Sequence, residues 1–118
     1  MQAARVLQEV LQQEMKESEL VKQILDYLSL RRVWAYRTNT GALRNPQGRP
    51  VRFNVPGHPD IVARLRTGKK NAKVVWIEAK GKGGKLSPEQ EEWQAKAKAH
   101  GDIFIVARCL EDVMGVFE

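Results

Sequence analysis

Cysteine and histidine are scarce in this chain of 118 residues, which contains one Cys and two His. Cys109 has no second thiol with which to form a disulfide or a zinc cluster, so a reducing, cytoplasmic setting is expected. His58 and His100 lack the spacing of paired metal ligands, which argues against a zinc centre or histidine-based hydrolysis. The serines have no histidine partner, so a serine catalytic triad has no support either.

Long apolar runs are also missing. No run approaches the roughly 18 residues needed to span a bilayer, and the N-terminal segment lacks the continuous apolar region of a signal peptide. No membrane partner is therefore expected. The glycine-rich residues 81–85, G-K-G-G-K, lack the ending of a Walker loop, which argues against a nucleotide cofactor. With 42% hydrophobic and 29% charged residues, positions 1–118 are expected to form one domain with an ordinary core.

Acidic residues are nearly absent from the middle of the chain. Residues 31–73 contain eleven Lys and Arg but a single acid, Asp60, which gives a local net charge of +10 within a total of +6. Concentrated positive charge implies a polyanionic partner, and DNA or RNA phosphates are the common one. The alternative is a solubilising surface whose arginine stems cover apolar atoms. A lone acid inside so basic a block favours a site at Asp60.

The apolar pattern predicts helices at both ends of the chain and strands between them. Residues 2–30 follow helical spacing, as one long element or as two with a break near 15–18. Residues 1–15 are expected to be a helical N-terminal extension that can contact a partner subunit. The remaining elements are a loop at 38–50, strands at 32–37, 51–55, 60–66, 73–80 and 103–107 (the last one buried), and helices at 87–99 and 110–116. This order predicts a mixed α/β sheet with helices packed on it.

The two central strands are predicted to form a hairpin through the turn-prone residues 67–71, T-G-K-K-N. A hairpin centred near Lys69 places Asp60 directly opposite Glu78, where cross-strand Cβ atoms lie only about 4.5–5.5 Å apart. Two carboxylates at that separation repel each other unless a cation lies between them. Because side chains alternate along a strand, Lys80 shares a face with Glu78. Two acidic groups and one ammonium therefore converge, as in a metal-dependent phosphodiesterase site.

A divalent ion could be held at this spot by few protein ligands. Mg²⁺ prefers oxygen and keeps several waters, so Asp60 and Glu78 suffice if substrate phosphate completes the shell. Glu17 lies in the middle of an apolar helical stripe, so it either caps the helix or points into the site as a further ligand. Lys80 could orient or deprotonate an attacking water, or stabilise developing negative charge. The plain alternative is a surface salt bridge, but the flanking G-x-P-D and K-L-S-P-E-Q segments favour a site.

The neighbouring residues have structural as well as functional interpretations. Ser87 and Gln90 match a capping box at a helix start, and the Gln90 amide could also face the site. His58 lies two positions before Asp60, where it could contact a phosphate or a base or simply form the turn. The tryptophans Trp34, Trp76 and Trp93 are expected to lie in the core rather than to form a base-stacking surface.

Together these residues resemble a known family. Glu17 on the first helix, R-T-N-T-G at 37–41, G-H-P-D at 57–60, E-A-K at 78–80 and K-L-S-P-E-Q-E-E-W at 85–93 form an ordered set. This set is similar to the VRR-NUC domain, the virus-type replication-repair nuclease branch of the PD-(D/E)XK superfamily, over roughly residues 16–113. One departure is His58, where the family more often has an apolar residue. The resemblance implies a restriction-endonuclease-like core and phosphodiester cleavage with one or two Mg²⁺ or Mn²⁺ ions.

The resemblance also implies roles for individual residues. The catalytic set would be Glu17, Asp60, Glu78, Lys80 and Gln90. The metal ligands would be Asp60, Glu78, Ala79 and Glu17. The residues expected to contact DNA are Arg37, Asn39, Arg44, Arg49, Arg52, His58, Lys82 and Lys85.

Stand-alone relatives of this length look like phage or bacterial proteins that act as homodimers on branched DNA, Holliday junctions among them. A dimer suits that substrate, because resolving a four-way junction takes two symmetric cuts and one chain offers one site. Two other interpretations stay open: a nicking or restriction-type enzyme of the same fold, and a non-catalytic nucleic-acid-binding module. The expected setting is the cytoplasm of a bacterial host or a phage-infected cell.

Overall fold

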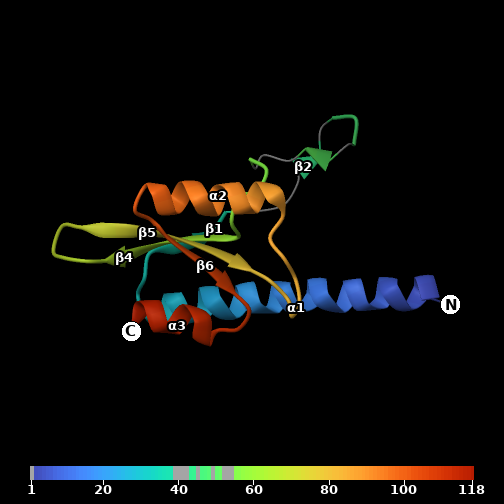
Figure 1. Cartoon of the computed structure of the whole chain (residues 1–118), viewed down its shortest axis with the longest axis horizontal. Helices are drawn as coiled ribbons and strands as arrows, with labels where there is room; N and C mark the ends of the chain where they lie inside the picture. The colour runs from blue at the N-terminus through green and yellow to red at the C-terminus, as the bar shows by residue number, and fades with distance from the viewer. Residues whose placement is uncertain (1, 39–42, 45, 49, 52–54) are drawn as a thin grey trace.

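The computed structural model describes residues 2–38, 43–44, 46–48, 50–51 and 55–118. A four-stranded sheet lies between α2 (Pro88–Ala99) on one side and α1 (Gln2–Leu30) and α3 (Glu111–Phe117) on the other (Figure 1). The strands are β1 (Ala35–Arg37), β2 (Leu43–Arg44), β3 (Pro50–Val51), β4 (Ile61–Arg66), β5 (Ala72–Ala79) and β6 (Ile103–Ala107). The predicted mixed α/β sheet flanked by helices is confirmed.

Helix α1 is uninterrupted, so the break considered near 15–18 does not occur. Its buried side chains, among those described, are Leu20, Val21, Ile24 and Leu28, which helical spacing places on one face against the sheet. The N-terminal turns of α1 extend past the sheet, away from this core (Figure 1). Neither α1 nor another helix in the described ranges combines the length and apolar character that crossing a membrane requires.

Strands β4 and β5 form the central hairpin. Ile61 pairs with Ile77 and Arg66 pairs with Ala72, so the hairpin is centred at Lys69, as the turn predicted. Strand β1 continues the sheet antiparallel beyond β4, and β6 runs parallel to β5, which gives the order β1-β4-β5-β6. Odd-numbered residues of β4 and β5 join the core against α1, whereas even-numbered residues face the layer of α2.

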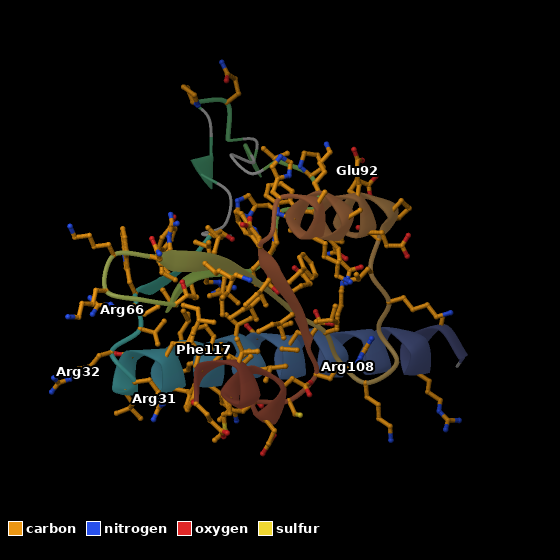
Figure 2. All side chains as sticks on the ribbon, turned by 60° about the vertical axis from the view of Figure 1, so that its left-hand side comes forward. Arg31, Arg32, Arg66, Glu92, Arg108 and Phe117 are labelled. Atoms are coloured by element: carbon orange, nitrogen blue, oxygen red, sulfur yellow. The ribbon has the colours of Figure 1, made fainter. Side chains whose placement is uncertain are left out.

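The core lies between the sheet and the pair α1 and α3. Arg31 joins these two helices, since its Nη2 atom donates a hydrogen bond of 2.8 Å to the carbonyl of Phe117. Figure 2 shows these two residues close together at the C-terminal end of α1. Among the residues whose side chains are described, the largest fully buried ones are Ile24, Leu28, Ile61, Ile77, Val75, Val113 and Pro59.

The structure corrects several strand predictions. The first strand begins at Ala35, because Arg32 adopts a left-handed φ of 57° in the turn that follows α1. The loop predicted at 38–50 contains β2, which pairs with β3 through Leu43 and Val51. Strands of two residues are too short to leave an alternating pattern in the sequence.

Two further predictions hold only in part. Of the strand predicted at 51–55, Val51 lies in β3, Val55 is outside a strand, and 52–54 lie outside the described residues. Strand β6 is present but incompletely buried: Ile105 and Ala107 are buried, and the other three side chains are half-buried. Strand β6 lies at an edge of the four-stranded sheet, so its apolar run overstates its burial.

Candidate active site

Asp60 and Glu78 lie opposite each other where β4 begins and β5 ends. Ile61 pairs with Ile77, and the same register places Asp60 opposite Glu78 at the next position. The Asp60 Oδ2 atom accepts a hydrogen bond of 2.8 Å from the Ala79 N–H, which fixes the carboxyl group against β5. Glu78 is buried, with 5% of its surface exposed. Two carboxyl groups thus share one poorly solvated spot.

Burial is the main cause that raises the pKa values of both groups, and nearby acidic side chains add to each rise. Burial raises the pKa of Glu78 to about 8, with a further contribution from Asp60, while the Lys80 ammonium opposes the shift. The pKa of Asp60 is also raised, chiefly by burial, although the hydrogen bond from Ala79 acts in the opposite direction. A cation between the two groups would remove the repulsion and favour both carboxylates. The electrostatics therefore fit a cation site.

Two side chains orient Glu78 through the same oxygen. The Gln90 Nε2 atom donates to Glu78 Oε1 at 2.9 Å, and the Lys80 Nζ atom lies 3.7 Å from that oxygen. Gln90 also completes the capping box of α2. Its Oε1 atom accepts from the Ser87 N–H at 2.8 Å, and the Ser87 hydroxyl accepts from the Gln90 N–H at 3.2 Å. The amide therefore ties the first turn of α2 to the buried carboxyl group.

The turn before Asp60 is held from two directions. Gly57 has a φ of +82°, and a Cβ atom there would lie 2.5 Å from the backbone of Glu89. Glycine meets both conditions, because it adopts this φ without strain and leaves room for the helix backbone. On the other side, the Thr38 N–H donates to the Asp60 carbonyl at 2.9 Å, and the Thr38 hydroxyl donates to the carbonyl of Pro59. The backbone of Asp60 is thereby fixed.

Glu17 and Arg108 hold the segment that follows Lys80. The Glu17 Oε1 atom accepts a hydrogen bond of 2.9 Å from the Gly81 N–H, and the Arg108 Nη1 atom donates to the Gly81 carbonyl, also at 2.9 Å. Figure 2 shows Arg108 beside α1. Glu17 is close enough to the opposed carboxyl groups to contribute to the rise in their pKa values. Both side chains therefore act at the edge of the site.

The structure offers two close carboxyl groups for a metal ion. Within the described ranges, no three Asp, Glu, His or Cys side chains are arranged to hold a metal together. Glu17 was expected as a further ligand, but its Oε1 atom accepts the hydrogen bond from the Gly81 N–H. Asp60 and Glu78 still fit Mg²⁺ or Mn²⁺, because such ions bind one or two carboxylates and complete their shell with water and phosphate. Ala79 can add only its backbone carbonyl oxygen, since its side chain is a methyl group.

The aromatic residues separate into a packed group and an exposed one. The ring centroid of His58 lies 5.8 Å from that of Trp76 and 4.6 Å from that of Trp93, and the tryptophans are 5.4 Å apart. Trp76 also donates from Nε1 to Asp102 at 2.9 Å. Trp34 is 71% exposed, so the prediction of a core position is wrong for this residue. It flanks the edge strand β1, whereas α2 packs over β5 and β6.

The residues expected to contact DNA are described in part. Arg37, at the end of β1, is close enough to Asp60 to oppose the rise in its pKa. Lys82 and Lys85 are exposed in the loop between β5 and α2. Arg44 has its backbone in β2. The positions that lie outside the described residues are Asn39, Arg49 and Arg52.

Thr38 and Arg108 had no role assigned from the sequence. Thr38 follows β1 directly, and its contact with Asp60 depends on the pairing of β1 with β4. Because β1 is short, the sequence gives little indication of this pairing. Arg108 follows β6, which runs parallel to β5. The carboxyl ends of neighbouring parallel strands lie at the same end of the sheet. A basic residue directly after the apolar run at 103–107 could therefore have indicated a side chain near the end of β5.

Comparison with models of protein families shows to which family the chain belongs. The family model of the VRR-NUC domain matches residues 3–110, nearly the whole length. The chain therefore belongs to the VRR-NUC family, and this membership points to a nuclease domain. Because the match starts at residue 3, it includes nearly all of α1. No curated protein and no solved structure matches the chain.

Proposed function

We propose that the chain is a divalent-metal-dependent DNA endonuclease of the PD-(D/E)XK type. The observation that carries the proposal is the opposed pair Asp60 and Glu78, with the Lys80 Nζ atom 3.7 Å from Glu78. Buried groups with raised pKa values and a specific charged partner are typical of functional sites. The sheet order, with its antiparallel hairpin and parallel β6, supports a restriction-endonuclease-like core.

Asp60 and Glu78 would hold one or two Mg²⁺ or Mn²⁺ ions, with the Ala79 carbonyl as a further oxygen ligand. Such an ion, when bound, lowers the pKa of water and offsets charge on the scissile phosphate. The protein supplies the positioning: the Ala79 N–H holds the Asp60 carboxyl group, and the Gln90 amide holds that of Glu78. Because these hydrogen bonds already orient the two carboxyl groups, little rearrangement is needed when the substrate binds.

Lys80 is the proposed catalytic lysine. Its side chain is 15% exposed and shares a sheet face with the two carboxyl groups. From there its ammonium group can orient the attacking water or donate to a phosphate oxygen that gains negative charge. Gly81, the next residue, has its N–H held by Glu17 and its carbonyl held by Arg108. Glu17 would therefore act on the reaction through the backbone that carries Lys80.

Branched DNA is the proposed substrate and a homodimer the proposed active form. The basic residues between 31 and 73 supply charge for DNA phosphates. Resolving a Holliday junction takes two symmetric cuts, and each chain contributes one Asp60–Glu78 pair. The N-terminal turns of α1, which extend past the sheet (Figure 1), offer a surface on which two copies could associate.

Cleavage of a labelled four-way junction, a flap and a linear duplex tests the proposal. We expect cleavage of branched DNA with Mg²⁺ or Mn²⁺ and none with a chelator. Asp60→Asn and Lys80→Ala should lower the rate by at least about 100-fold. Glu92→Gln, which changes an exposed acid on α2, is the control and should leave the rate unchanged. Sedimentation of the active protein should give the mass of a dimer.

Other outcomes would assign other functions. If the wild type cleaves no substrate with either metal, the chain is a binding module and the proposal is overturned. In that case Asp60→Asn should only strengthen DNA binding, because it removes a negative charge from a basic surface. Cleavage of the linear duplex in preference to the junction would instead assign a nicking or restriction-type activity.

A further inference from the structure

Two exposed aromatic side chains lie two positions apart at the edge strand β1, which leads to the candidate active site. Trp34 is 71% exposed and Tyr36 is 53% exposed. Isolated apolar residues are common on protein surfaces, but grouped ones mark surfaces that bind a partner. Aromatic rings do so most strongly, because each buries a large area when it is covered. The pair therefore offers a surface that suits a partner with flat apolar faces.

The two rings share a sheet face with the carboxyl pair. Backbone hydrogen bonds continue the β1–β4 pairing to the residues that flank β1, so the alternation of side chains places Trp34, Tyr36 and Thr38 on the same side. Tyr36 pairs with Val62 across the β1–β4 ladder, and the N–H of Thr38 donates to the Asp60 carbonyl on the next step of that face. The four steps from Trp34 to Thr38 cover about 13 Å along the strand. The rings thus form a short path that ends at Asp60.

Arginine side chains flank this path. The Arg64 guanidinium carbon lies 5.7 Å from the centroid of the Trp34 ring, within range of a cation–π contact. Trp34 and Arg64 also line a hollow in which Arg31, Arg32 and Arg66 outnumber a single acid, Glu118. Figure 2 shows Arg32 and Arg66 at the same end of the molecule. Flat apolar rings and positive charge therefore occur on one surface.

We propose that Trp34, Tyr36 and Arg64 form a stacking platform for the unpaired bases of a single DNA strand that leads to Asp60. An unpaired base can place its flat face on an aromatic ring, whatever its sequence, while cationic side chains follow the phosphates. Bases within a duplex have both faces covered by their neighbours, so the platform selects unpaired ones. This inference rests on the nuclease function proposed above and specifies which arm of a branched substrate the protein holds.

A second copy of the chain suits this surface less well. The platform lies among arginines, so a two-fold contact through it would bring like charges together. Strand β1 is also only three residues long, which limits the backbone hydrogen bonds available for adding a strand at its edge. A nucleic acid strand, in contrast, matches both the rings and the charge.

Binding of fluorescent oligonucleotides, followed by anisotropy in chelator, tests the platform. All proteins carry Asp60→Asn to prevent cleavage, and a single strand is compared with a duplex of the same sequence. Trp34→Ala and Tyr36→Ala should each weaken single-strand binding by at least about fivefold and duplex binding by less than about twofold. Trp34→Phe keeps a ring and should retain most of the affinity. Leu30→Ala, at an apolar residue that is 85% exposed on α1, is the matched control.

The salt dependence separates stacking from charge. Trp34→Ala should leave the slope of log affinity against log salt concentration unchanged, because the indole ring neutralises no phosphate. Arg64→Gln should reduce the magnitude of that slope by about 0.7 for each single-strand phosphate that the guanidinium group neutralises in the wild type. Circular dichroism of each variant checks that the fold is retained.

Unchanged single-strand affinity in Trp34→Ala and Tyr36→Ala would overturn the inference, and so would an equal loss for single strand and duplex. If these substitutions instead change the mass of the protein in solution, the surface belongs to a second copy, and the inference is likewise overturned. Because binding is measured without cleavage, these failures leave metal-dependent cleavage by the wild type unaffected. Conversely, platform binding without any cleavage would overturn the proposed function alone.

Discussion

The Gln90 Nε2 atom donates a hydrogen bond of 2.9 Å to Glu78 Oε1, which joins the start of α2 to the buried carboxyl group. The other end of the same amide, Oε1, accepts the Ser87 N–H at 2.8 Å. Both ends of the side chain are therefore engaged. The orientation of Glu78 consequently depends on where α2 begins.

Gln90→Ala should reduce both stability and cleavage, whereas Ser87→Ala should reduce stability alone. Each substitution disrupts the capping box, at a cost of about 1 kcal/mol. Only Gln90→Ala also removes the donor to Glu78, and removal of such a supporting hydrogen bond lowers activity by about 10- to 100-fold. Urea unfolding and cleavage of the branched substrate measure the two effects. Equal cleavage rates in the two variants would show that Gln90 acts on the helix only.

Gly57→Ala should destabilise the protein more than Gly83→Ala. The two glycines have φ values of +82° and +81°, so alanine costs roughly 1–2 kcal/mol at either position. At Gly57 the new Cβ would also lie 2.5 Å from the backbone of Glu89, whereas nothing lies within 4 Å at Gly83. The turn or α2 must then move, and Asp60 with it. Denaturant unfolding measures the difference, and equal free energies of unfolding would contradict the close packing of turn and helix.

In chelator, the free energy of unfolding should decrease as pH rises from about 4.5 to about 8. The pKa of Glu78 is raised from 4.5 to about 8 in the folded protein, so between these values the folded chain keeps a proton that the unfolded chain releases. More protons bound to the folded state mean that stability falls with rising pH across this window. Saturating Mg²⁺ should diminish the decline, because the ion favours the ionised carboxyl group.

Urea unfolding of the wild type and Glu78→Gln across this pH range isolates the contribution of one carboxyl group. The variant lacks this titration, so its stability relative to that of the wild type should increase with pH. Parallel profiles for the two proteins would show that the pKa of Glu78 is close to its ordinary value.

Glu17→Gln should retain most of the cleavage activity, whereas Glu17→Ala should lose it. Glutamine keeps an oxygen that can accept the Gly81 N–H, and alanine does not. We expect cleavage by Glu17→Ala to fall by about tenfold or more, with a much smaller effect in Glu17→Gln. Glu19→Gln, at an exposed position of α1, is the control. An equally large loss in Glu17→Gln would assign the Glu17 charge a direct role in metal binding.

Local patterns in the sequence predict much of the site. A turn-prone segment between two apolar strands predicts the hairpin register, and that register places Asp60 opposite Glu78. Position-specific residues predict the start of α2, because Ser87 accepts a backbone N–H, Pro88 fits the first helical position and Gln90 closes the capping box. These features need no knowledge of how distant segments pack.

Contacts between distant segments are not predicted in this way. Arg108 reaches Gly81 across 27 positions, and the sequence around either residue does not indicate the other. Trp34 is apolar and was expected in the core, but its exposure depends on which part of the sheet α2 covers. The requirement for glycine at Gly57 likewise depends on the approach of Glu89. Tertiary packing decides each of these.

Calorimetric titration of Mn²⁺ into the protein tests the central claim most directly. We predict saturable binding to the wild type that is retained in Glu92→Gln and abolished in Asp60→Asn and in Glu78→Gln. Binding near neutral pH should also release protons, because the ion displaces the proton of Glu78, so the heat should depend on the buffer. Undiminished Mn²⁺ binding by the double variant of Asp60→Asn and Glu78→Gln would contradict a metal site between these carboxyl groups.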